Sequence, residues 1–215
     1  MTPDAVVNYL RQHPEFLEEQ ADFLATIMIP HPYGGRAIPI GERQILTLRE
    51  KSKRIEDKLR ELIVFGEQND AISEKLHRLA LALINASDIE TTITVLHFNL
   101  REDFAVPHTV LRLWPQGERA DLPEFLAASA AARDFAASLA NPYCSAHAMV
   151  DTGEWFGEAA THLRSFAYIA LKNGETFGLL ALASEDAQRF YPEMGTLYLK
   201  RLGEMAAAAL VGYPT

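Results

Sequence analysis

The chain has 215 residues, of which 48% are hydrophobic and 23% are charged, as is usual for a folded globular protein. Its formal net charge of −9 argues against a nucleic-acid module that binds mainly through phosphate contacts, because such modules are basic. A single cysteine cannot form an intrachain disulfide, which fits a reducing compartment. We find neither a secretory signal nor the ~20 apolar residues that span a bilayer, so we expect a cytoplasmic protein with no membrane segment.

Residues 1–40 are predicted to form a short helical segment followed by a Pro/Gly linker. Apolar residues recur at near-helical spacing over residues 4–29, and Pro14 should interrupt the run. The stretch from Pro30 to Gly35 holds two prolines and two glycines and cannot continue a helix.

A long helix is predicted from Gly41 onward, because no proline occurs between Gly41 and Asn85. Residues 41–68 are interpreted as a coiled coil, with an apolar seam at Leu48, Ile55, Leu59 and Leu62 that would join two copies of the chain. Past Gly66 the apolar pattern resumes in a different phase, as a stutter produces. The alternative is a helix that packs on its own domain throughout.

Residues 69–215 are predicted to form one α+β domain. The Ser-x-x-Glu pattern at Ser87–Glu90 has the form of a capping box, which should begin a helix that runs to about Phe104. The expected order after that helix is a strand at 107–114, a helix at 122–140, a short strand at 143–150, a short helix at 154–162, two strands at 165–172 and 176–183, and a helix between Pro192 and about Val211.

The two apolar runs that flank Asn173-Gly174 give the clearest local signal, because Asn-Gly is a strong hairpin turn. Both runs are almost wholly apolar, which predicts a central hairpin with both faces covered. Helices come first and the strands lie in the middle. That order favours an antiparallel sheet with helices beside it.

The run Gly178–Ser184, the pair Arg189-Phe190 and the terminal helix together resemble the closing part of GAF domains. With Pro14-Glu15-Phe16, Asp103-Phe104 and Leu111–Trp114 in this order, nearly the whole chain is similar to domain-of-unknown-function family 484 of Gram-negative bacteria. The resemblance implies a GAF-like antiparallel sheet flanked by helices. It brings no catalytic or ligand-binding residues, because the family has no established activity.

A GAF-like pocket would be walled by the sheet and by the segments between about 120 and 165. Its candidate lining residues carry polar or aromatic tips: Arg112, Trp114, Cys144, His147, Trp155, Ser165 and Tyr168. The alternative is that Trp114 and Tyr168 only pack in or beside the core and that Arg112 is solvated.

Motifs for other chemistry are missing from the sequence. It has no phosphate-binding glycine loop, and its seven histidines are scattered, so we expect no metal and no cofactor. Cys144, three residues before His147, is the one nucleophile candidate, although a buried cysteine that packs as a small apolar group is commoner.

The sequence favours a non-enzymatic sensory or adaptor module that forms a homodimer through its long helix. It would bind an unknown small ligand, an unknown partner protein, or both. The alternatives are a structural interaction module with no ligand and, less favoured, an enzyme that depends on Cys144.

Overall fold

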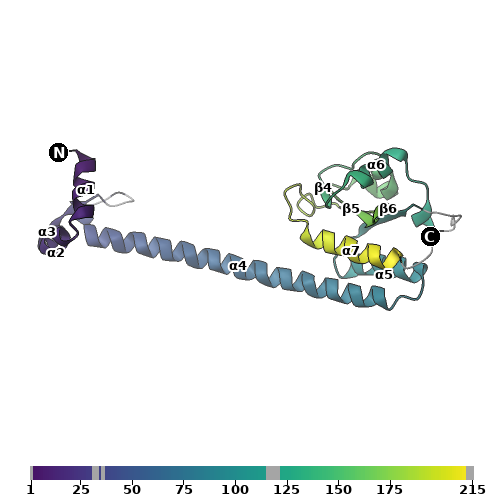
Figure 1. Cartoon of the computed structure of the whole chain (residues 1–215), viewed down its shortest axis with the longest axis horizontal. Helices are drawn as coiled ribbons and strands as arrows, with labels where there is room; N and C mark the ends of the chain where they lie inside the picture. Colours follow the sequence, from purple (N-terminus) through teal and green to yellow (C-terminus); the bar gives the residue numbers. More distant parts are fainter. Residues whose placement is uncertain (1, 31–33, 35–36, 115–121, 212–215) are drawn as a thin grey trace. The chain divides into compact units, whose positions relative to one another are not determined.

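The computed structural model describes residues 2–30, 34, 37–114 and 122–211. The chain divides into two compact units, Met1–Glu67 and Gln68–Thr215. Short helices, a pair of two-residue strands and the first part of a long helix make up the described part of the first unit. An antiparallel sheet and its covering helices make up that of the second (Figure 1).

The first unit begins with α1 (Pro3–Gln12), α2 (Glu15–Glu19) and α3 (Ala21–Thr26). The predicted interruption at Pro14 is confirmed, because α1 ends at Gln12 and α2 begins directly after the proline. Of the predicted linker, only Pro30 and Gly34 belong to the described residues.

Two short strands in the first unit were not predicted. β1 (Met28–Ile29) pairs antiparallel with β2 (Ile38–Pro39), directly before the long helix. The side chain of Arg43 reaches back from the helix and donates a hydrogen bond to the carbonyl oxygen of Pro30 at 3.1 Å. Strands of two residues lie below the length at which apolar alternation can be read from a sequence.

The predicted long helix is confirmed as α4 (Ile40–Ile84), which runs without interruption for 45 residues. Its burial changes along its length. The seam residues near its start are 57–64% exposed: Leu48, Ile55, Leu59 and Leu62. Near its end, Leu76, Leu79 and Leu83 are buried in the core of the second unit. No helix among the described residues combines the length and apolar character needed to cross a bilayer.

The second unit is built on a sheet with the strand order β3-β6-β5-β4, in which every neighbouring pair is antiparallel. Its strands are β3 (His108–Leu113), β4 (Tyr143–Ser145), β5 (Ser165–Asn173) and β6 (Glu175–Ser184). The predicted hairpin is confirmed: β5 and β6 are the central strands, and Gly174 makes the turn with a φ of 75°. Glycine suits this turn because it has no Cβ to oppose a positive φ.

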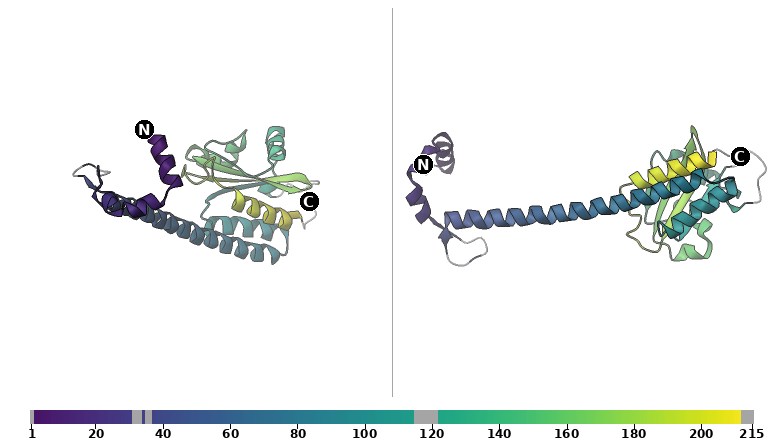
Figure 2. Two further views of the ribbon diagram at one scale, coloured as in Figure 1. Left: turned by 60° about the vertical axis from the view of Figure 1, so that its left-hand side comes forward. Right: turned by 90° about the horizontal axis from the view of Figure 1, so that it is seen from below.

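Helices cover both faces of the sheet, as the apolar hairpin strands predict (Figure 2). One face, with Ile169 and Leu180, packs against the end of α4, α5 (Ile89–Glu102) and α7 (Leu197–Val211). The other face, with Tyr168 and Leu179, packs against α6 (Ala130–Ser138) and the 3₁₀ helix η2 (Thr152–Thr161). The second unit is therefore an α+β structure with a core on each side of its sheet.

Two predicted helix starts are wrong in detail. The N-cap of α5 is Asp88 and not Ser87: the Asp88 carboxylate accepts a hydrogen bond from the Thr91 backbone NH at 2.7 Å. The predicted helix at 122–140 is divided into η1 (Pro123–Phe125) and α6. It divides because Ser129 caps α6 by accepting from the Ala132 backbone NH at 3.0 Å, and a capping residue has non-helical backbone angles.

The remaining differences concern length. β4 ends at Ser145, whose hydroxyl accepts a hydrogen bond from the His147 backbone NH and turns the chain away from the sheet. The short helix after it is a 3₁₀ helix interrupted at Gly157, where φ is 56°. The last helix, α7, begins at Leu197.

A substitution at Gly203 tests how closely α7 packs on the sheet. A Cβ at this position would lie 2.3 Å from Cγ2 of Ile169 on β5. We expect Gly203→Ala to lower the free energy of unfolding by roughly 1–3 kcal/mol, as overpacking does. Urea denaturation measures the change. Gly195→Ala is the matched control, because a Cβ there would meet no atom within 4 Å.

Replacing Ile169 with leucine removes the branched methyl that blocks residue 203. Adding Ile169→Leu to Gly203→Ala should therefore recover part of the lost stability. If the two changes instead destabilise additively, the close approach of α7 to β5 is not the cause of the loss.

Candidate functional site

The face of the sheet that was predicted to wall a pocket is organised around Tyr168, whose side chain is fully buried. Its hydroxyl accepts a hydrogen bond from the Met149 backbone NH at 3.0 Å and shares another with the Thr152 hydroxyl at 2.8 Å. Thr152 in turn donates to the Met149 carbonyl oxygen at 2.6 Å. The ring packs edge-on against Phe135 with 5.3 Å between centroids. Tyr168 thus fixes the chain between β4 and η2 to the sheet.

Arg112 projects from the edge strand β3 on this same face and connects it to two neighbouring segments. Its guanidinium donates to the Pro123 carbonyl oxygen at 2.7 Å and lies 5.4 Å from the ring centroid of Trp155. Burial lowers the pKa of Arg112, an effect that the carboxylate of Glu124 opposes. The side chain is therefore a half-buried link between β3, η1 and η2, and it is not simply solvated.

Trp114 follows the end of β3 and belongs to the same packed cluster as Tyr168. The guanidinium of Arg133, from α6, lies 5.6 Å from the centroid of its ring. Cation–π contacts of this kind contribute about 0.5–1 kcal/mol at exposed sites. Trp114 and Trp155 are thus each paired with an arginine from another element.

His97 on α5 forms a polar contact that the sequence did not indicate. Its Nδ1 shares a hydrogen bond with the Thr109 hydroxyl at 2.7 Å, and its Nε2 lies 3.6 Å from a carboxylate oxygen of Glu124. Burial lowers the pKa of His97 from its ordinary 6.5, and the attraction of Glu124 opposes this without reversing it. His97 and Thr109 lie twelve residues apart, so only the fold brings them together.

The other residues that were predicted to line the pocket do not lie together. Ser165 is buried, and its hydroxyl donates to the Asp186 carbonyl oxygen at 2.7 Å. Cys144 packs in the core cluster on the opposite face of the sheet from Tyr168, and burial raises the pKa of its thiol. His147 is exposed. A buried thiol with a raised pKa is the reverse of the activated cysteine that nucleophilic chemistry needs.

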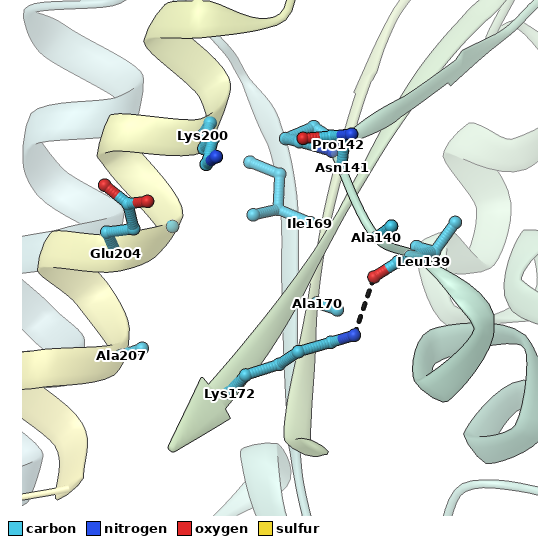
Figure 3. A pocket seen from close by; sticks show the side chains of 11 residues that line it. Leu139, Ala140, Asn141, Pro142, Ile169, Ala170, Lys172, Lys200, Glu204 and Ala207 are labelled. Carbon is cyan, nitrogen blue, oxygen red and sulfur yellow. Dashed lines mark hydrogen bonds between the residues drawn. The ribbon is translucent and has the colours of Figure 1, made fainter. Parts of the chain in front are cut away.

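Two cavities differ in what they can hold. The smaller, of about 170 Å³, lies between α7 and the chain that leads into β4, and is lined by Lys200, Glu204 and Ile169 (Figure 3). Lys172 lies at its side and donates to the Leu139 carbonyl oxygen at 2.7 Å. The larger, of about 770 Å³, is lined by residues of α4, α7 and the segment around Arg189. Of these two volumes, the larger lies within the 300–1,000 Å³ that is typical of small-molecule sites.

Within the described ranges, no three His, Cys, Asp or Glu residues gather closely enough to hold a metal ion. The sequence contained no signal for the larger cavity: Arg189-Phe190 is one of the pieces that carry the family resemblance, but that resemblance implies no ligand-binding residue. Lys75 and Tyr198, which also line it, have no distinguishing motif.

We expect Tyr168→Phe to lower the free energy of unfolding by about 1–3 kcal/mol, because it leaves the Met149 NH and the Thr152 hydroxyl without their shared partner. Chemical denaturation measures the loss, and hydrogen exchange should accelerate at Met149. Tyr143→Phe is the control at an exposed tyrosine. Equal effects of the two substitutions would contradict the role assigned to the Tyr168 hydroxyl.

The lowered pKa of His97 predicts a pH dependence of stability. Below about pH 6.5 the unfolded chain binds a proton at His97 that the folded chain does not, so stability falls as the pH is lowered until the folded pKa is reached. His97→Gln should flatten the dependence in that window. His162→Gln, at an exposed histidine, should leave it unchanged. The prediction is tested by measuring the free energy of unfolding of the unmodified chain and of both variants between pH 5 and 8.

Comparison with known proteins supports the resemblance seen in the sequence. The family model described as "Protein of unknown function, DUF484" matches residues 1–214. A curated relative from Salmonella typhimurium strain LT2, described as "Uncharacterized protein YigA", is 28% identical over 119 residues. That match covers 55% of this chain and 50% of the relative, so the chain spans about half of that protein's length. Because the family model extends over nearly the whole chain, the protein belongs to the DUF484 family of proteins of unknown function.

Proposed function

We propose that the protein is a GAF-like sensory or adaptor module that forms a homodimer through the first part of α4. One observation carries the proposal: the seam residues Leu48, Ile55, Leu59 and Leu62 are exposed along a helix that continues into the second unit.

The seam has the spacing of a coiled coil. Ile55, Leu59 and Leu62 are separated by four and three residues, and Leu48 lies one heptad before Ile55. Most of the stability of a helix in a protein comes from the packing of its apolar face and not from intrinsic propensity. Burying one leucine or isoleucine side chain fully is worth about 1.5–3 kcal/mol. A second copy of the same helix is the occupant that such a repeat fits.

The end of α4 connects the proposed dimer interface to the core of the second unit. Leu76, Leu79 and Leu83 are buried beside α5 and α7, so a change in the packing of this unit acts directly on the helix. The sensory proposal is that a ligand or a partner protein of the second unit alters α4 in this way.

A structural interaction module without a ligand is the second candidate, and the same exposed seam favours it. The two candidates differ in whether a molecule that binds the second unit alters α4. Neither assigns a catalytic role to Cys144, whose burial and raised thiol pKa support a packing role.

We expect Ile55→Glu combined with Leu59→Glu to convert the dimer into a monomer, because four carboxylates would be buried without partners in each dimer. Light scattering coupled to size-exclusion chromatography gives the mass, against 24.0 kDa for one chain. Val64→Glu is the matched control, since Val64 is an exposed apolar residue outside the seam. A double variant that keeps the dimer mass would refute the seam as the interface.

A further inference from the structure

The cavity of about 770 Å³ lies on the face of the sheet that carries α4, α5 and α7. This is the face opposite to the one where the sequence predicted a pocket. α7 runs alongside the end of α4 in this region (Figure 2), and the Tyr198 hydroxyl donates to the Asn69 carbonyl oxygen at 3.3 Å to join them. The cavity therefore lies against the part of the long helix that belongs to the second unit.

Its wall is mainly aliphatic. Six of the lining residues are aliphatic side chains buried in the core: Leu76, Leu100, Val106, Leu182, Leu199 and Leu202. A ligand with an apolar body would remove these aliphatic side chains from water, as ligands do in small-molecule sites with a mainly apolar lining.

Arg189 gives the same cavity a positive charge. Its guanidinium donates to the Phe104 carbonyl oxygen and lies 5.8 Å from the ring centroid of Phe190. Its Nε is buried and has no hydrogen-bond partner among the described residues. No carboxylate of the described chain lies within ion-pair distance of this guanidinium. A buried N–H group without a hydrogen-bond partner costs free energy, which an anion that accepts from it would offset.

Lys75, from α4, lines the cavity as a second cation, and Asp186 is the acidic residue on its wall. The carboxylate of Asp186 accepts a hydrogen bond from the Gln188 backbone NH at 2.9 Å, which holds it within its own turn. The charged lining residues are thus two cations and one anion, with an excess of positive charge.

From this combination we infer that the cavity binds a small amphipathic anion, with an aliphatic body against the leucines and a single carboxylate beside Arg189 and Lys75. This rests on the part of the proposed function that gives the second unit a ligand, and it does not depend on the dimer. Because Leu76 of α4 lies in the wall, occupancy of the cavity also stabilises the end of the long helix.

Calorimetric titration of the full-length chain with decanoate, a ten-carbon carboxylate, tests the inference. Decan-1-ol has the same chain length without the charge and should bind at least tenfold more weakly. Decanoate should also raise the melting temperature of the chain, because a ligand of the folded state stabilises it.

Variants show whether binding takes place in this cavity. Arg189→Gln should weaken decanoate binding at least tenfold, and Arg189→Lys should recover part of the loss because it restores the charge. Lys75→Gln keeps the contact between Arg189 and Phe104 and should weaken binding as well. Arg133→Gln is the control, since Arg133 lies on α6 over the opposite face.

Three results would overturn the inference: no heat of binding with decanoate, equal affinities for decanoate and decanol, or an unchanged affinity in both Arg189→Gln and Lys75→Gln. Light scattering on the same samples gives the oligomeric state, so the ligand inference and the dimer proposal are tested independently. A dimer that fails to bind decanoate refutes the ligand class alone, whereas a monomer that binds it refutes the dimer alone.

Discussion

The structure depends on how one 45-residue helix divides its apolar side chains between two environments. Leu76, Leu79 and Leu83 are buried in the core of the second unit, where α5, α7 and the sheet surround them. Ile55 and Leu59, on the first part of the same helix, are exposed. One uninterrupted helix thus carries an exposed apolar stretch in the first unit and a buried apolar stretch in the second.

The sheet of the second unit imposes a related constraint. Its central strands are buried on both faces, so each face needs its own layer of helices. On one face, Gly203 allows α7 to approach Ile169 closely. On the other, the hydroxyl of Tyr168 binds Met149 and Thr152 and so holds the chain that leads from β4 into η2 against the sheet. The cavity beside Arg189 lies on the first of these faces, next to the long helix.

Features that depend on local pattern could be predicted from the sequence. The hairpin at Asn173-Gly174 and the long helix follow from turn chemistry and from the absence of proline. The N-cap of α5 could not be settled, because Ser87 and Asp88 are both good caps and only the geometry selects Asp88. Contacts such as His97 with Thr109 join residues through the fold, and no spacing rule indicates them. For the same reason the cavity at Arg189 was missed, since its wall comes from four separated elements.

Hydrogen exchange along α4 tests the central claim most directly, when the unmodified chain is compared with the Ile55→Glu, Leu59→Glu variant. If a second copy covers the seam, amides at 45–62 are protected in the unmodified chain and lose that protection in the variant. Amides at 76–83, which the second unit buries, stay protected in both. Equally fast exchange at 45–62 in the two proteins would contradict the account.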